Sequence, residues 1–307
     1  MLAISQDELG GPEVLKATTV PQPDPGVGEI LVRVRAAGVN PIDVINRQTG
    51  QLVGQPPFIL GWDVSGIVEA VGLGVTLYQP GDEVFGLLPF PHGHGAYAEF
   101  VVGPARGFVH KPDDLGHVQA AAIPLAGLTG WQALVDTAKL TAGQRVLITA
   151  AAGGVGHFAV QIAKARGAHV TGLARPDSAD FVASLGADEV IDYTATDFSN
   201  AVQDLDVVFD MVGHDYPAKA LQVLKPGGTL VSALPQSLPP VLAEAAERGI
   251  RAAGLLVESD RLGLTALVEL MSAGQLAPTI AATFPLDAVG IAQTEKSGPG
   301  KTVLTVS

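Results

Sequence analysis

Residues 145–156 read Arg-Val-Leu-Ile-Thr-Ala-Ala-Ala-Gly-Gly-Val-Gly, and this stretch decides the fold of the middle of the chain. Arg145–Ala150 is apolar enough for a buried strand, and Val155–Arg166 has the periodicity of an amphipathic helix that stops at Gly167. The glycine-rich turn Ala151–Gly156 joins them. A strand, a glycine-rich turn and a helix in this order predict the first unit of a dinucleotide-binding sheet.

The glycines of this turn have separate tasks. Ala151 replaces the first glycine of the G-x-G-x-x-G pattern, whereas Gly153 and Gly156 hold the second and third places. The second glycine lets the backbone approach a pyrophosphate, and the third lets the helix pack closely on the strand. The helix N-terminus then faces the anion, although a tight turn without a ligand remains the alternative. We predict that a nicotinamide dinucleotide contacts Ala152, Gly153, Gly154, Val155 and Gly156.

The next strand predicts which nicotinamide dinucleotide binds. An acidic residue about twenty positions beyond the turn would bond the ribose 2′-hydroxyl of NAD. Here the strand Ala168–Leu173 is followed by Ala174 and Arg175, so the acid is missing and a guanidinium is present. A guanidinium binds a 2′-phosphate with paired hydrogen bonds. We therefore predict NADPH, with a solvated loop charge as the alternative for Arg175.

The remaining pattern predicts two domains. Residues 1 to about 120 contain short alternating segments such as Glu29–Arg35, separated by proline and glycine, which favours a β-rich barrel or sandwich. From 121 to 260, apolar strands alternate with helices, beginning with a helix over Leu125–Ala138, which favours a doubly wound parallel sheet. The tail contains a predicted helix over Leu286–Glu295 and a last strand, Lys301–Val306, expected to return to the first domain. The fold class is α/β.

Composition excludes several classes of protein. The net charge is −13 and no basic run is present, which argues against nucleic acid. The chain has no cysteine, so it has neither disulfides nor thiolate metal sites nor a cysteine nucleophile. We expect a cytoplasmic protein with no membrane association, since no signal peptide and no apolar run of about 20 residues is visible.

Several blocks carry a family resemblance, in the family's order and over nearly the whole chain. They are Gly10–Leu15, Ala36–Asp43, Leu60–Glu69, Gly81–Gly86, Gly95–Phe100, Leu128–Gly130 and the glycine turn. With these blocks the chain resembles the zeta-crystallin-like quinone oxidoreductase branch of the medium-chain dehydrogenases/reductases. This resemblance implies a GroES-like catalytic domain (1–120 and 261–307), a Rossmann NADP-binding domain (121–260), an active site in the cleft between them, and a homodimer formed through the Rossmann sheet edge.

The family's zinc site is replaced. Zinc alcohol dehydrogenases of this superfamily have cysteine where Asn40 stands and His-Glu where Trp62-Asp63 stands. An amide and an indole do not replace a thiolate and an imidazole as zinc ligands. We therefore expect a zinc-independent member, and we interpret His92 and His94 as loop residues, with their contact to substrate left open.

A reaction without a Lewis acid favours an acceptor that is already electrophilic. A quinone or an α,β-unsaturated carbonyl delocalises the arriving charge onto its own oxygen, so the protein mainly orients the reactants. Asn40 is the best candidate to donate to that carbonyl or to orient the nicotinamide ribose, although it may simply cap the turn before Pro41. Asp43 is the second catalytic candidate, or else a cap of the following short helix. Similar enzymes carry tyrosines nearby, but Ile45, Gln48 and Leu52 occupy that stretch here, which favours a proton from solvent.

The resemblance also implies further cofactor contacts. Thr129 would lie beside the nicotinamide, Tyr193 near the 2′-phosphate unless it is only a surface residue, and Lys301 at a cofactor phosphate. Val212, Ser232 and Ala233 would line the dinucleotide, with Leu234–Pro240 as a candidate mobile flap. The leading hypothesis is an NADPH-dependent quinone or enone reductase; the alternatives are a biosynthetic enoyl reductase and a noncatalytic NADPH-binding redox sensor.

Overall fold

The computed structural model describes residues 1–295 and 298–307. The chain forms two compact units, the first comprising 1–128, 258–268 and 278–307 and the second 129–257 and 269–277. The first unit thus extends to 128, beyond the expected boundary at 120. One reason is that the Leu125 N–H donates to the buried carboxylate of Asp63, at 2.6 Å, which ties this segment to the first unit.

The first unit is built around the long strand β3 (Glu29–Val39). Its sheet has seven strands in the order β15-β16-β3-β5-β6-β8, with β7 also paired to β3, and a second sheet has the order β2-β1-β4. Every second residue of β3 from Ile30 to Gly38 is buried, as expected for a strand with one face on a core, and Leu31 and Ala37 of the other face are buried as well. The other strands are β1 (Leu2–Gln6), β2 (Lys16–Thr19), β4 (Phe58–Ile59), β5 (Asp63–Val71), β6 (Glu83–Leu87), β7 (Phe100–Pro104), β8 (Phe108–His110), β15 (Ile280–Pro285) and β16 (Lys301–Thr305).

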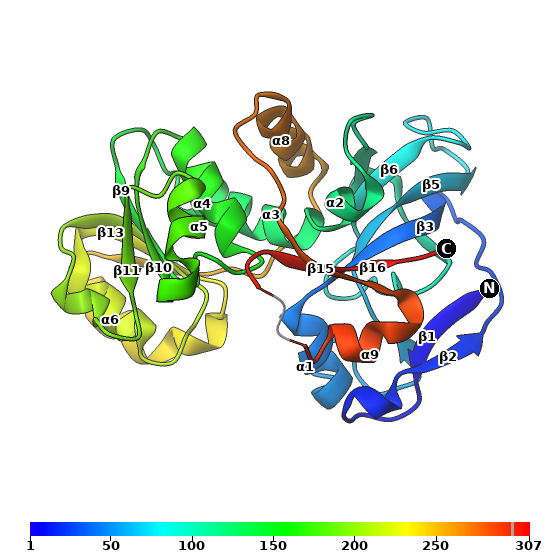
Figure 1. Cartoon of the computed structure of the whole chain (residues 1–307), viewed down its shortest axis with the longest axis horizontal. Coiled ribbons are helices and arrows are strands. Elements are labelled where there is room, and N and C mark those ends of the chain that lie inside the picture. The colour runs from blue at the N-terminus through cyan, green and yellow to red at the C-terminus, as the bar shows by residue number, and fades with distance from the viewer. Residues whose placement is uncertain (296–297) are drawn as a thin grey trace. The chain divides into compact units, whose positions relative to one another are not determined.

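The last strand returns to the first unit, as predicted. In Figure 1 the red strand β16 runs beside the blue strand β3, and the two are antiparallel with Thr302 opposite Val39. This pairing brings Lys301, at the start of β16, to the carboxyl end of β3. The helices of this unit are α1 (Pro41–Thr49), α2 (His117–Ala121) and α9 (Val289–Ala292).

The second unit confirms the predicted Rossmann fold. Its six parallel strands have the order β11-β10-β9-β12-β13-β14, which is the 3-2-1-4-5-6 order of dinucleotide-binding sheets. Helices α4 (Gly156–Ala165) and α5 (Ala179–Ser184) lie on one face and α6 (Tyr216–Val223) on the other (Figure 1). The remaining elements are β9 (Arg145–Ile148), β10 (His169–Ala174), β11 (Glu189–Asp192), β12 (Leu205–Asp210), β13 (Leu224–Ser232), β14 (Arg251–Gly254) and α7 (Leu242–Glu247).

Some predicted helices differ in kind or length. The expected helix over Leu125–Ala138 is α3 (Pro124–Trp131) followed by a π-helix, Gln132–Thr137. The expected helix over Leu286–Glu295 is a 3₁₀ turn followed by the four-residue α9, where Gly290 and two β-branched residues are weak helix formers. Helix α8 spans Arg261–Ser272. None of the helices in the described residues is long and apolar enough to span a membrane.

Candidate active site

The glycine turn lies at the switch point of the Rossmann sheet, between the neighbouring strands β9 and β12. A Cβ at Gly156 would lie 2.2 Å from the Ala150 oxygen and 2.7 Å from the Ala151 Cα, so packing alone requires glycine there. A Cβ at Gly153 would approach only the Ala150 oxygen, at 3.1 Å. The chain's own packing therefore gives a weaker reason for Gly153, which fits a position that a ligand approaches closely.

Arg175 and Tyr193, both predicted at the 2′-phosphate, lie together. They follow the adjacent strands β10 and β11, and the Arg175 Nε donates to the Tyr193 hydroxyl at 2.9 Å. This bond raises the pKa of Arg175, which keeps its charge in any case. Because Nε makes this bond and Arg175 is exposed, the two Nη groups of the guanidinium remain able to bind an anion.

The ends of β12 and β13 are organised by a residue that the sequence did not point out. Asp210 is fully buried and accepts hydrogen bonds from the Val212 and Gly213 N–H groups at 2.9 and 3.0 Å. Its other oxygen accepts from the Ser232 hydroxyl at 2.8 Å, and the Ala233 N–H donates to the Asp210 carbonyl at 2.9 Å. The predicted dinucleotide contacts Val212, Ser232 and Ala233 are therefore brought together by Asp210, at the carboxyl edge where such ligands bind.

Thr129, predicted beside the nicotinamide, and Leu234–Pro240, predicted as a flap, both include buried residues. Thr129 is buried in α3 with 6% exposure. Leu234–Pro240, expected to be a mobile flap, begins with the 3₁₀ turn Pro235–Ser237 and runs into a second one, Pro239–Val241. Leu238 between them is only 4% exposed and belongs to the hydrophobic core, so part of this segment is anchored.

In the first unit, Asn40 lies at the end of β3, with a polar partner on each side of its amide. Its Nδ2 donates to Asp63 Oδ2 at 2.8 Å, and its Oδ1 accepts a short hydrogen bond from Lys301. The Lys301 ammonium also donates to the Val39 carbonyl at 3.0 Å and lies 3.6 Å from Asp63. Burial lowers the pKa of Lys301, and the Asp63 and Asp43 carboxylates oppose that shift.

These contacts bear on the predicted role of Lys301. Lys301 is only 3% exposed, and its ammonium donates to the Val39 carbonyl and to the Asn40 Oδ1. The position therefore favours a role in holding Asn40 over the expected contact with a cofactor phosphate.

Asp43 caps the first turn of α1, one of the two roles expected for it. Its Oδ2 accepts from the Asn40 backbone N–H at 2.6 Å. Asp43 is completely buried, and its pKa is raised to about 7. Burial is the main cause and the nearby Asp63 carboxylate adds to it, whereas the Asn40 N–H, the Tyr97 hydroxyl and Lys301 act in the opposite direction. Two carboxyl groups and one ammonium therefore belong to this buried cluster.

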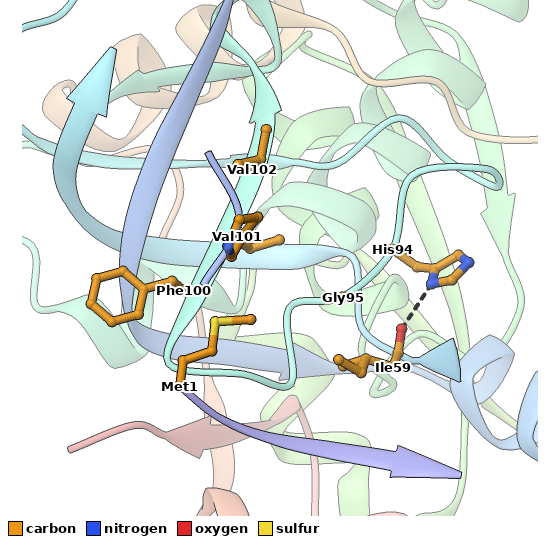
Figure 2. Close-up of a pocket in the computed structure, with 8 residues that line it drawn as sticks. Met1, Ile59, His94, Gly95, Phe100, Val101 and Val102 are labelled. Atoms are coloured by element: carbon orange, nitrogen blue, oxygen red, sulfur yellow. Dashed lines mark hydrogen bonds between the residues drawn. The ribbon is translucent and has the colours of Figure 1, made fainter. Parts of the chain in front are cut away.

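The ring nitrogens of Trp62 and His94 contact backbone carbonyls of the first unit. Trp62 is fully buried, stacks edge-on against Phe90, and donates from Nε1 to the Pro91 carbonyl at 3.3 Å. The His94 Nδ1 lies 2.7 Å from the Ile59 carbonyl (Figure 2), beside a pocket of about 340 Å³. None of the predicted site residues lines that pocket, whose walls are Met1, Pro23, Ile59, His94, Gly95, Phe100, Val101 and Val102.

A six-stranded Rossmann sheet with a glycine-rich turn at its switch point, in one chain with a β-rich unit, is typical of two-domain nicotinamide-dependent oxidoreductases. Two family models match the chain. A model described as an alcohol dehydrogenase GroES-like domain matches residues 26–113, and one described as a zinc-binding dehydrogenase matches residues 185–303.

Relatives define the family more closely. The chain is 35% identical to a quinone oxidoreductase of Coxiella burnetii, whose structure matches with a TM-score of 0.93 over 100% of this chain and 99% of the other. It is 36% identical to a mitochondrial NAD(P)H oxidoreductase of Mus musculus, over 91% of this chain and 82% of the relative. A quinone oxidoreductase of Escherichia coli, solved with NADPH, matches at 29% identity and a TM-score of 0.89, over 99% of this chain and 100% of the other. The chain belongs to the medium-chain dehydrogenase/reductase superfamily, in its zeta-crystallin-like quinone oxidoreductase branch.

Proposed function

We propose that this protein is an NADPH-dependent reductase that transfers hydride to quinones or α,β-unsaturated carbonyls without a metal. The observation that carries the proposal is the Asn40 amide held between Lys301 and Asp63. In the zinc enzymes of this superfamily a thiolate stands at this position, bound to the metal. Here a hydrogen-bond donor and a buried ammonium stand there instead.

The residues at this centre do not fit a zinc ion. A Zn²⁺ site needs three or four converging thiolate, imidazole or carboxylate ligands. The Asn40 oxygen is already bonded to the Lys301 ammonium, which would repel a divalent cation at the same place. The Trp62 Nε1 carries a hydrogen and donates it to the Pro91 carbonyl, so this indole offers no lone pair to a metal.

The second unit fits NADPH. The helix α4 presents its N-terminus behind the glycine turn, where a pyrophosphate is favoured by the backbone N–H groups and the helix dipole. The Arg175–Tyr193 pair supplies a guanidinium and a hydroxyl for a 2′-phosphate. The solved Escherichia coli relative, which contains NADPH, supports the same assignment.

The reduced nicotinamide, when bound, supplies the hydride. The chain's contribution is to orient the acceptor and to stabilise the negative charge that develops on its oxygen. The second N–H of the Asn40 amide is suited to that task. With a quinone, NADPH and one proton the products are a quinol and NADP⁺, and with an enone they are the saturated carbonyl and NADP⁺. We assign the proton to solvent.

The proposal is tested by steady-state oxidation of NADPH and NADH with a panel of quinones and enones. We expect turnover with both kinds of acceptor and a clear preference for NADPH that Arg175→Ala removes. A preference for NADH that Arg175→Ala leaves unchanged would contradict the cofactor assignment. Tight NADPH binding without turnover of any acceptor would favour a redox sensor over a reductase.

A further inference from the structure

The side chains around Asn40 decide which way its amide faces. An ammonium group only donates hydrogen bonds, so the Asn40 atom that contacts Lys301 must be the oxygen. A carboxylate only accepts, so the atom 2.8 Å from Asp63 must be the nitrogen. Flipping the amide would set its N–H groups against the ammonium and its oxygen against the carboxylate. The two neighbours therefore select a single orientation.

This orientation leaves a defined polar group at Asn40. The oxygen is committed to Lys301, and one of the two N–H groups of Nδ2 is committed to Asp63. Within residues 1–295 and 298–307 the second N–H group makes no hydrogen bond, so it is the part of the amide left to meet a ligand. A ligand that meets Asn40 must therefore offer a hydrogen-bond acceptor rather than a donor.

We propose that Lys301 and Asp63 are positioning residues that fix Asn40 as a hydrogen-bond donor, so that the centre recognises an acceptor oxygen, the carbonyl oxygen of the quinone or enone. This inference rests on the proposed function for the identity of that ligand, but not for the orientation of the amide. Hydride transfer places negative charge on the carbonyl oxygen, and a donor held in advance stabilises that charge without a reorganisation cost.

The surrounding backbone is built to hold the two positioning residues. A Cβ at Gly38 would lie 2.4 Å from the Asp63 carboxylate and 2.7 Å from the Ala121 carbonyl, so the absent side chain makes room for the carboxylate. The Leu125 N–H anchors the second oxygen of Asp63 at 2.6 Å. Lys301 is placed by the pairing of β16 with β3. Three segments distant in sequence therefore converge on one amide.

Side-chain NMR tests the orientation directly, because the chain contains only three asparagines, Asn40, Asn46 and Asn200. In the full-length protein labelled with ¹⁵N-asparagine, the side-chain signal that disappears in Asn40→Ala belongs to Asn40. We expect its two amide protons to be well separated in chemical shift and slow to exchange with solvent. Lys301→Met removes the hydrogen bond to the Asn40 Oδ1, so it should change the chemical shifts of the two Asn40 amide protons and accelerate their exchange with solvent.

Lys111→Met is the matched control. Lys111 is also a buried lysine of the first unit, bonded to Glu83 at 2.7 Å and to the Pro112 and Leu115 carbonyls. We expect it to leave the Asn40 signal unchanged. If Lys301→Met does not fold, the double variant Asp63→Asn/Lys301→Met removes both charges together, which avoids an unpaired buried carboxylate. An Asn40 signal identical to wild type in Lys301→Met or in this double variant would overturn the proposal.

Kinetics separate this inference from the proposed function. We expect Lys301→Met to lower kcat for quinone or enone reduction by about tenfold or more, with unchanged NADPH affinity, and to have little further effect when Asn40 is already alanine. Full activity in Lys301→Met would refute the positioning role even if the protein is a reductase. Conversely, if no acceptor is reduced by wild type while the NMR result holds, the proposed function fails and the orientation of Asn40 stands.

Discussion

Replacing Asp43 by asparagine should flatten the pH dependence of stability. Asp43 is completely buried, and its pKa in the folded protein is raised to about 7 from the ordinary aspartate value of 3.8. Between these two values the folded state holds a proton on Asp43 that the unfolded state has lost. The free energy of unfolding contributed by this group is therefore largest at low pH and declines as the pH rises toward 7.

The magnitude follows from the shift. A difference of about three pKa units corresponds to roughly 4 kcal/mol in all, of which about 2.5 kcal/mol is lost between pH 5 and pH 8. In Asp43→Asn the amide oxygen is able to accept the hydrogen bond that Asp43 takes from the Asn40 N–H at 2.6 Å, but the side chain does not titrate. The variant should therefore lack this decline.

Urea unfolding at pH 5, 6, 7 and 8 measures the effect. Wild type should lose about 2.5 kcal/mol more stability than Asp43→Asn across this range, because all other titrating groups are common to both proteins. Asp24→Asn, a substitution at an exposed carboxylate, is the control and should follow wild type. If the free energy of unfolding changes with pH in the same way in wild type and Asp43→Asn, the raised pKa of Asp43 is refuted.

Three further predictions concern the second unit. Arg175→Ala should raise the KM for NADPH about tenfold or more and leave the KM for NADH unchanged, as measured by initial rates, with Tyr193→Phe intermediate. Gly156→Ala should destabilise the protein by about 2 kcal/mol or more in thermal unfolding, because its Cβ would lie 2.2 Å from the Ala150 oxygen. Gly153→Ala should instead unfold like wild type and weaken NADPH binding, as measured by a fluorescence titration. A homodimer paired through the edge strand β14 should appear in light scattering, and Ala253→Pro in that strand should give a monomer.

The sequence predicts those parts of the fold that local signals determine. The glycine turn, the alternation of apolar strands with helices after it, and the last strand are all set by patterns within a few tens of residues. The parallel sheet that these patterns predict is present. The π-helix after α3 and the short length of α9 are not predicted, because hydrophobic periodicity does not distinguish one type of helix from another or show where a helix ends early.

The sequence suggests the residues of the candidate site, but not most of the hydrogen bonds between them. Arg175 and Tyr193 are placed on neighbouring strands by the Rossmann order, so their contact is a consequence of a correctly predicted fold. The Asn40–Lys301 bond joins residues 261 positions apart and depends on the register of β16 against β3, which no local pattern specifies. The role of Asp210 is not visible in a local pattern, although an acid that ends the apolar strand β12 just before a turn is a signal for it.

Isotope transfer would show whether this chain transfers a hydride to an activated carbonyl without a metal. The protein is dialysed against a chelator, its zinc content is measured, and it is supplied with NADPH deuterated at C4 on the transferred side together with an enone. We predict a saturated ketone carrying deuterium at the β-carbon, formed at the same rate with and without added zinc. A product without deuterium, or activity that disappears on dialysis and returns with zinc, would contradict it.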